Sequence, residues 1–105
     1  MNQHLPDVYL DFRARFPQVS DSLDSLAREV DSAGPLDDRT VRLVKLGIAV
    51  ALQSPGAVRS NVRKALDAGA SADEVQQAIL LALTTAGFPA VVAALQWAQE
   101  VLETR

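Results

Sequence analysis

The side chains best suited to bind a charged ligand are basic and lie in one stretch of the chain. Between Arg39 and Leu66 there is no Asp or Glu, although the whole chain has thirteen acidic and ten basic residues. The basic residues of this stretch are Arg39, Arg42, Lys45, Arg59, Arg63 and Lys64. A cluster of charges of one sign attracts ligands of the opposite sign. We therefore expect any ligand site in this stretch to bind an anion.

Two helices would have to position these side chains. The sequence Ser54-Pro55-Gly56 interrupts a run of helical hydrophobic spacing, which predicts a tight turn between two helices. Arg42 and Lys45 would lie one turn apart on the first helix. There they form one wall of a pocket, or they lie on a solvated face, or they make a salt bridge to an acidic residue of another subunit. The ligand-binding candidates of this hairpin are Arg42, Lys45, Ser54, Arg59 and Asn61.

Three of these candidates also have structural interpretations. Ser54 precedes a proline, as an N-cap residue often does, so capping is its first expected role and ligand binding its second. Asn61 lies two turns beyond Ser54 on the same face, and it either donates a hydrogen bond to a ligand or serves the helix alone. Arg59 lies on a different face from Asn61, where contact with solvent or a partner subunit competes with ligand binding.

Length and composition indicate one small domain with surplus apolar surface. The chain has 105 residues, of which 49% are hydrophobic, and its aromatic residues are one Trp, one Tyr and three Phe. Ala, Leu and Val must therefore fill the core, as they do between closely packed helices. A domain of this size cannot bury so much apolar surface alone, so we expect self-association.

Charge and residue content exclude several classes of protein. The net charge of −3 argues against nucleic acid as a partner, and a helix-turn-helix interpretation fails because the recognition helix would carry Asp73 and Glu74 and no basic residue. The chain has no Cys, which excludes disulfides, thiolate metal sites and thiol catalysis. With no basic-then-apolar leader and no apolar run long enough to span a membrane, we expect a cytoplasmic protein.

Hydrophobic periodicity and helix-end signals predict six helices and no strand. The first helix runs from about Pro6 to Arg15, and the second is capped by Ser20 or Asp21 and ends at Gly34. The third helix begins at Asp37 or Asp38, and the fourth begins at Ser54-Pro55. The fifth begins at the capping box Ser71-x-x-Glu74 and ends at Gly87, and the sixth begins at Pro89. Six helices with short connections predict an all-α domain.

The sequence LDDRTVRLVKLGIAVALQS, followed by NVRKALDAGASADEVQQAILLA and GFPAVVAAL, resembles the carboxymuconolactone decarboxylase family, which includes the alkylhydroperoxidase D group. The resemblance covers residues 36–97. Within a single domain, 1–105, we therefore expect a family core at 36–97 and an N-terminal helical extension at 1–35. The resemblance implies helical hairpins that assemble into a homo-oligomer, commonly a trimer or a hexamer.

The resemblance also implies where a family site would lie. The peroxidase branch places a Glu on the third helix, a Cys-x-x-Cys at the start of the fourth and a His four residues later. In this sequence those positions are Arg42, Ser54, Ala57 and Asn61. Because no thiol is present, we exclude thiol peroxidase activity. The decarboxylase branch needs no metal and no cofactor, but it must bind an anion, stabilise an enolate-like charge and supply a proton.

Two functions remain open. In the first, the protein is a cofactor-independent lyase acting on a small carboxylate or lactone, with Arg42 binding the anion and Asn61 donating a hydrogen bond to developing charge. An asparagine cannot exchange protons near neutral pH, so this pair contains no acid. In the second, the protein is a non-catalytic relative that binds a small anion or serves as an oligomeric scaffold. The residues themselves do not decide whether it is an enzyme.

Overall fold

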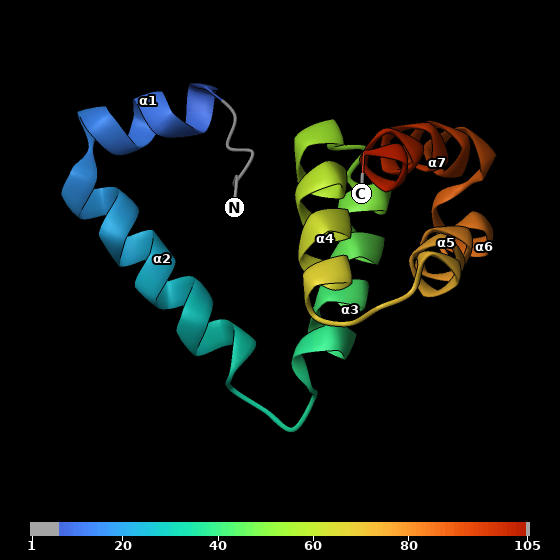
Figure 1. Ribbon diagram of the computed structural model, residues 1–105, viewed down its shortest axis with the longest axis horizontal. Coiled ribbons are helices and arrows are strands. Elements are labelled where there is room, and N and C mark those ends of the chain that lie inside the picture. The colour runs from blue at the N-terminus through green and yellow to red at the C-terminus, as the bar shows by residue number, and fades with distance from the viewer. Residues whose placement is uncertain (1–6, 105) are drawn as a thin grey trace. The chain divides into compact units, whose positions relative to one another are not determined.

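The chain is built from helices alone in the part that the structure describes, residues 7–104 (Figure 1). The computed structural model divides into two compact units, residues 1–35 and 36–105. The all-α fold expected from the sequence is confirmed. All six expected helical segments are present, and the fifth of them is divided in two.

The first unit contains two helices, α1 (Asp7–Arg15) and α2 (Pro17–Asp31). An ion pair of 3.2 Å between Arg13 and Asp24 joins them. The start of the first helix expected at Pro6 lies outside the described residues.

The start of α2 differs from the expectation. The helix begins at Pro17, whose fixed φ suits the first helical position. The Ser20 N–H closes its first turn on the carbonyl oxygen of Phe16 at 2.9 Å. The cap expected at Ser20 or Asp21 is therefore wrong, because the proline begins the helix one turn earlier.

The second unit contains five helices: α3 (Asp38–Ala51), α4 (Pro55–Asp67), α5 (Ala72–Leu80), α6 (Leu83–Ala86) and α7 (Phe88–Glu103). Side chains that accept hydrogen bonds fix the starts of α3, α4 and α5. The Thr40 N–H donates to Asp37 Oδ1 at 2.8 Å and so caps α3. At α5 the Glu74 N–H donates to Ser71 Oγ at 3.1 Å, and the Ser71 N–H donates back to Glu74 Oε1 at 2.9 Å. This is the capping box expected from the sequence.

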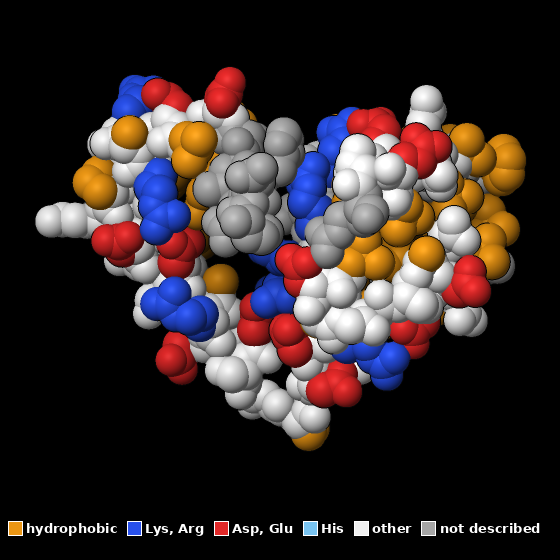
Figure 2. Space-filling model, viewed as in Figure 1, with side chains coloured by type: hydrophobic (Ala, Val, Ile, Leu, Met, Phe, Trp, Pro, Cys, Tyr) orange, Lys and Arg blue, Asp and Glu red, His pale blue; other side chains and the backbone are white. Residues whose placement is uncertain are grey.

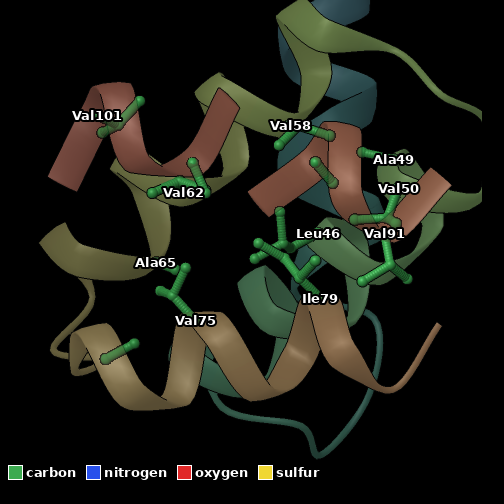
Figure 3. Close-up of a cluster of buried hydrophobic side chains, with 13 residues drawn as sticks. Leu46, Ala49, Val50, Val58, Val62, Ala65, Val75, Ile79, Val91 and Val101 are labelled. Carbon is green, nitrogen blue, oxygen red and sulfur yellow. The ribbon is translucent and has the colours of Figure 1, made fainter. Parts of the chain in front are cut away.

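The core of the second unit consists of aliphatic side chains from α3, α4, α5 and α7 (Figure 3). Of the residues that the structure describes, no aromatic side chain is buried, and small side chains let the helices approach closely. The largest fully buried hydrophobic side chains are Leu46, Ile79, Val50, Val58, Val62 and Val75. α3 and α4 thus form the hairpin expected from the Ser-Pro-Gly turn, and α5 and α7 cover it.

The fifth expected helix is divided at Leu81 and Ala82. α5 ends at Leu80, and the Ala82 N–H donates to the carbonyl oxygen of Ile79 at 3.1 Å, which is a tighter turn than the α-helical one. The short α6 follows and stops at Gly87, whose φ of 99° favours glycine. No Gly or Pro stands at the break, so the sequence has no local signal for it.

Candidate functional site

The α3–α4 hairpin carries all five candidate residues proposed from the sequence. Ser54 has the expected capping role, because its Oγ accepts a hydrogen bond from the Ala57 N–H at 3.4 Å. Asn61 lies one turn beyond Ala57 and is half-buried. Its Nδ2 donates to the carbonyl oxygen of Ala57 at 2.9 Å. Both polar side chains are therefore engaged with the backbone of their own helix, although the amide of Asn61 has a second N–H to offer.

The basic candidates have partners within the chain. Arg42 Nε lies 3.4 Å from Asp38 Oδ1, one turn earlier on α3, and only 17% of the Arg42 side chain is exposed. Arg59 Nε donates to Glu100 Oε1 at 3.2 Å and so ties α4 to α7. Lys45, one turn beyond Arg42, is half-buried. The structure thus brings Arg42 and Lys45 together on α3, and it turns Arg59 toward the last helix.

A groove lies on a different side of α3, where α5 and α6 pack against it. Its volume is about 450 Å³. Most of its lining is apolar, and polar groups come from four residues, Thr40, Glu74, Gln77 and Thr85. The apolar lining residues are Leu43, Val44, Gly47, Ala51, Ala78, Leu81, Ala82 and Ala86. None of the five candidate residues from the sequence is among those that line it.

Gly47 is the residue through which the sequence could have indicated this groove. It lies in the middle of α3 with an ordinary helical backbone, so no turn requires a glycine there. A Cβ at this position would meet only the carbonyl oxygen of Ala78, at 4.0 Å, which is an ordinary contact. A glycine inside a helix lowers stability relative to alanine by about 1 kcal/mol. Gly47 lines the groove, and its lack of a side chain adds space there.

Glu74 is the titratable side chain among the lining residues. Its carboxylate accepts the Ser71 N–H and forms an ion pair of 2.7 Å with Arg39 Nη1. The hydrogen bond from the Ser71 backbone, together with the charge of Arg39, lowers the pKa of Glu74 below its ordinary value. Glu74 is therefore ionised at neutral pH and accepts hydrogen bonds rather than donating them.

Two other kinds of site can be assessed over residues 7–104. In this part of the chain, no group of three or more His, Asp and Glu side chains could hold a metal ion. Nor does any described helix combine the length and the apolar composition needed to cross a membrane.

Comparison with known proteins places the chain in a family. The model of the carboxymuconolactone decarboxylase family matches residues 17–100, so it extends over α2 as well as the core found by resemblance. An uncharacterised protein of Methanocaldococcus jannaschii is 29% identical over 85 residues, which are 81% of this chain and 79% of that protein. The crystal structure of the apo form of a carboxymuconolactone decarboxylase family protein from Legionella pneumophila matches with a TM-score of 0.79 and 26% identity. That match covers 90% of this chain and 84% of the other. The chain belongs to the carboxymuconolactone decarboxylase family.

Proposed function

We propose that this protein binds a small, mostly apolar molecule in the groove between α3, α5 and α6. The observation that carries this proposal is the groove itself, whose volume of about 450 Å³ lies within the range of about 300–1,000 Å³ typical of ligand pockets. Its lining is apolar with a few polar groups, as in most such pockets. Thr40, Gln77 and Thr85 offer hydroxyl and amide groups that can both donate and accept hydrogen bonds. They fit a ligand with an uncharged polar group on an apolar body.

Gly47 supports a binding role. An alanine would fit at this position and would stabilise α3, yet a glycine is present and leaves space at the wall of the groove. The small side chains of Ala51, Ala78 and Ala82 have the same effect along the rest of the lining. A groove held open at a cost in stability is typical of a site that is kept for a ligand.

The state of Glu74 favours binding over catalysis. A general acid works best when its pKa lies near the operating pH. The pKa of Glu74 is instead lowered, and its carboxylate is already held by Ser71 and Arg39. Among the described lining residues, no other side chain titrates. A non-catalytic binding protein is therefore our first choice, with an uncharged ligand in place of the small anion expected from the sequence.

A lyase acting on a small carboxylate or lactone is the second candidate. The observation in its favour is that the Arg42 side chain is only 17% exposed and pairs at 3.4 Å with the exposed Asp38, whose carboxylate a substrate carboxylate would replace. Asn61 retains one N–H that can donate to developing negative charge. The missing acid would have to come from another subunit or from the substrate.

We also propose that the protein works as a homo-oligomer. Large hydrophobic side chains are exposed outside the groove, and Figure 2 shows them gathered over α6 and α7. The exposed ones on these two helices are Leu83, Phe88, Val92 and Leu95. Exposed apolar patches of this kind are typical of interfaces.

A thermal-shift screen tests the proposed function. The compounds are small uncharged esters, lactones and alcohols, a matched set of carboxylates, and apolar molecules without a polar group. A ligand at one hundred times its Kd stabilises the folded protein by about 2.7 kcal/mol. If the ligand binds in the groove, the uncharged compounds should raise the Tm, and they should raise it equally in Arg42→Ala. Shifts confined to carboxylates and lost in Arg42→Ala, with turnover of the hit, would favour the lyase. No shift with any set at millimolar concentration would contradict both.

A further inference from the structure

Helix α2 carries an apolar stripe that α1, the other helix of its unit, does not cover. Between 54% and 59% of each of its four large side chains is exposed: Val19, Leu23, Leu26 and Val30. Among the described residues of α1 and α2, the only buried one is Ser20, so this pair of helices has no apolar core of its own. An isolated helix of 15 residues is marginal in water, and its stability normally comes from packing its apolar face against another element.

The spacing of the stripe is that of a helix-to-helix seam. The intervals between its members are four, three and four residues, which keep the side chains on one face of a helix. In coiled coils, the same alternation of three- and four-residue intervals lets the side chains of one helix fit into the holes between the side chains of the other. The stripe covers 11 residue steps, about 16 Å of helix. It therefore offers a continuous seam to a second helix.

The order of the side chains makes the stripe complementary to itself. Read in either direction along the helix, it is Val, Leu, Leu, Val. In an antiparallel pair of two copies, Val19 of one copy would lie opposite Val30 of the other. Leu23 would likewise lie opposite Leu26. A two-fold interface requires such self-complementarity, because the same surface is used by both subunits.

The charges on α2 agree with this arrangement. Positions 20, 22 and 27 beside the stripe are Ser, Ser and Ala, and Glu29 is the one charged neighbour. In an antiparallel pair the two Glu29 side chains lie at opposite ends of the seam, so like charges do not meet. The opposite face of α2 carries Asp21 and Arg28, which remain in solvent.

We propose that the α2 stripe is the surface on which a second copy of the chain docks, antiparallel and around a two-fold axis. The interface buries the seam of Val19, Leu23, Leu26 and Val30 from each copy. It does not depend on a ligand in the groove, which lies in the other unit.

Engineered cysteines test this arrangement, because the natural chain contains none. Val19→Cys and Val30→Cys are made singly and together in the full-length protein, then oxidised. Antiparallel pairing places position 19 opposite position 30, so only the double variant is expected to form disulfide-linked dimers. In the single variants the two cysteines lie about 16 Å apart along the helix, too far for a disulfide. The control is Asp21→Cys with Arg28→Cys, which places two cysteines on the opposite face of α2, about 10 Å apart along the helix, and should not cross-link.

Each outcome decides the proposal. The proposal is supported if only the double variant cross-links. It also requires that Leu23→Asp halve the mass of the assembly, measured by light scattering, and leave the circular dichroism spectrum unchanged. Cross-linking of either single variant shows parallel pairing and overturns the proposal. Absence of cross-linking in the double variant, or an unchanged mass for Leu23→Asp, shows that α2 packs elsewhere, including against its own chain, and overturns it as well.

Discussion

Arg39 and Glu74 join the first turn of α3 to the first turn of α5 through an ion pair of 2.7 Å. Glu74 also lines the groove and completes the capping box with Ser71. One carboxylate thus fixes the start of α5, the approach of α5 to α3 and the charge at the edge of the groove. This relationship makes the mouth of the groove sensitive to pH and to substitution.

Acid should weaken the fold partly through Glu74. Its pKa is lowered in the folded protein, so it contributes stability above the ordinary glutamate pKa of about 4.3 and loses it as the pH falls through the lower folded value. Glu74→Gln keeps an oxygen that can accept the Ser71 N–H but does not titrate. We expect urea unfolding of Glu74→Gln to depend less on pH below about 4.3 than that of the natural protein. An identical dependence in both would contradict this role of Glu74.

Removal of the α5 cap should cost more than an average surface substitution. Ser71→Ala leaves the Glu74 N–H without its acceptor. We expect the free energy of unfolding to fall by about 1 kcal/mol, measured by urea denaturation at neutral pH. Ser71→Asp is the matched variant, because aspartate is also a good N-cap and should retain most of the stability. Equal losses in the two variants would show that the cap is not the cause.

Gly47→Ala should stabilise the protein. The new methyl group has room, and alanine is the better helix former by about 1 kcal/mol. The expected rise in Tm is about 4–8 °C for a domain of this size. Gly56→Ala is the control, since Gly56 also lies in a helix and a Cβ there meets nothing within 4 Å. If Gly47→Ala loses stability and Gly56→Ala does not, α3 and α5 cannot accept a side chain at this wall of the groove.

Asn61→Ala separates a structural from a functional asparagine. The Asn61 side chain donates to a carbonyl oxygen of its own helix, and alanine has the higher helix propensity. We expect the free energy of unfolding to rise by about 0.5 kcal/mol, measured by denaturation. A marked loss of stability would show that the side chain supports the fold through a further contact. The same variant shows whether any turnover found for the protein depends on this amide.

Most of the fold could be predicted because the ends of its helices carry strong local signals. The cap at Asp37, the Ser54-Pro55 start and the Ser71–Glu74 capping box are each determined by the chemistry of two or three adjacent residues. The break after Leu80 could not be predicted, since no residue there disfavours a helix strongly. It arises in the packed second unit, where Leu81 and Ala82 line the groove beside α3.

The candidate site was less predictable than the fold. The basic cluster around Arg42 and the capping role of Ser54 can be read from residue types along one hairpin. The groove needs three helices whose contact is set by packing, and its lining consists of ordinary Leu, Val and Ala residues. Gly47, a glycine inside an apolar helical run, was the one local sign of it.

The most direct test of ligand binding in the groove is the affinity of Gly47→Leu for a compound found in the thermal-shift screen, measured by isothermal titration calorimetry. The leucine side chain would fill the space beside α3, so we expect binding at least about tenfold weaker, a loss of about 1.4 kcal/mol. Gly56→Leu adds the same side chain outside the groove and should bind as the natural protein does. Equal affinity of Gly47→Leu and the natural protein would contradict binding in this groove.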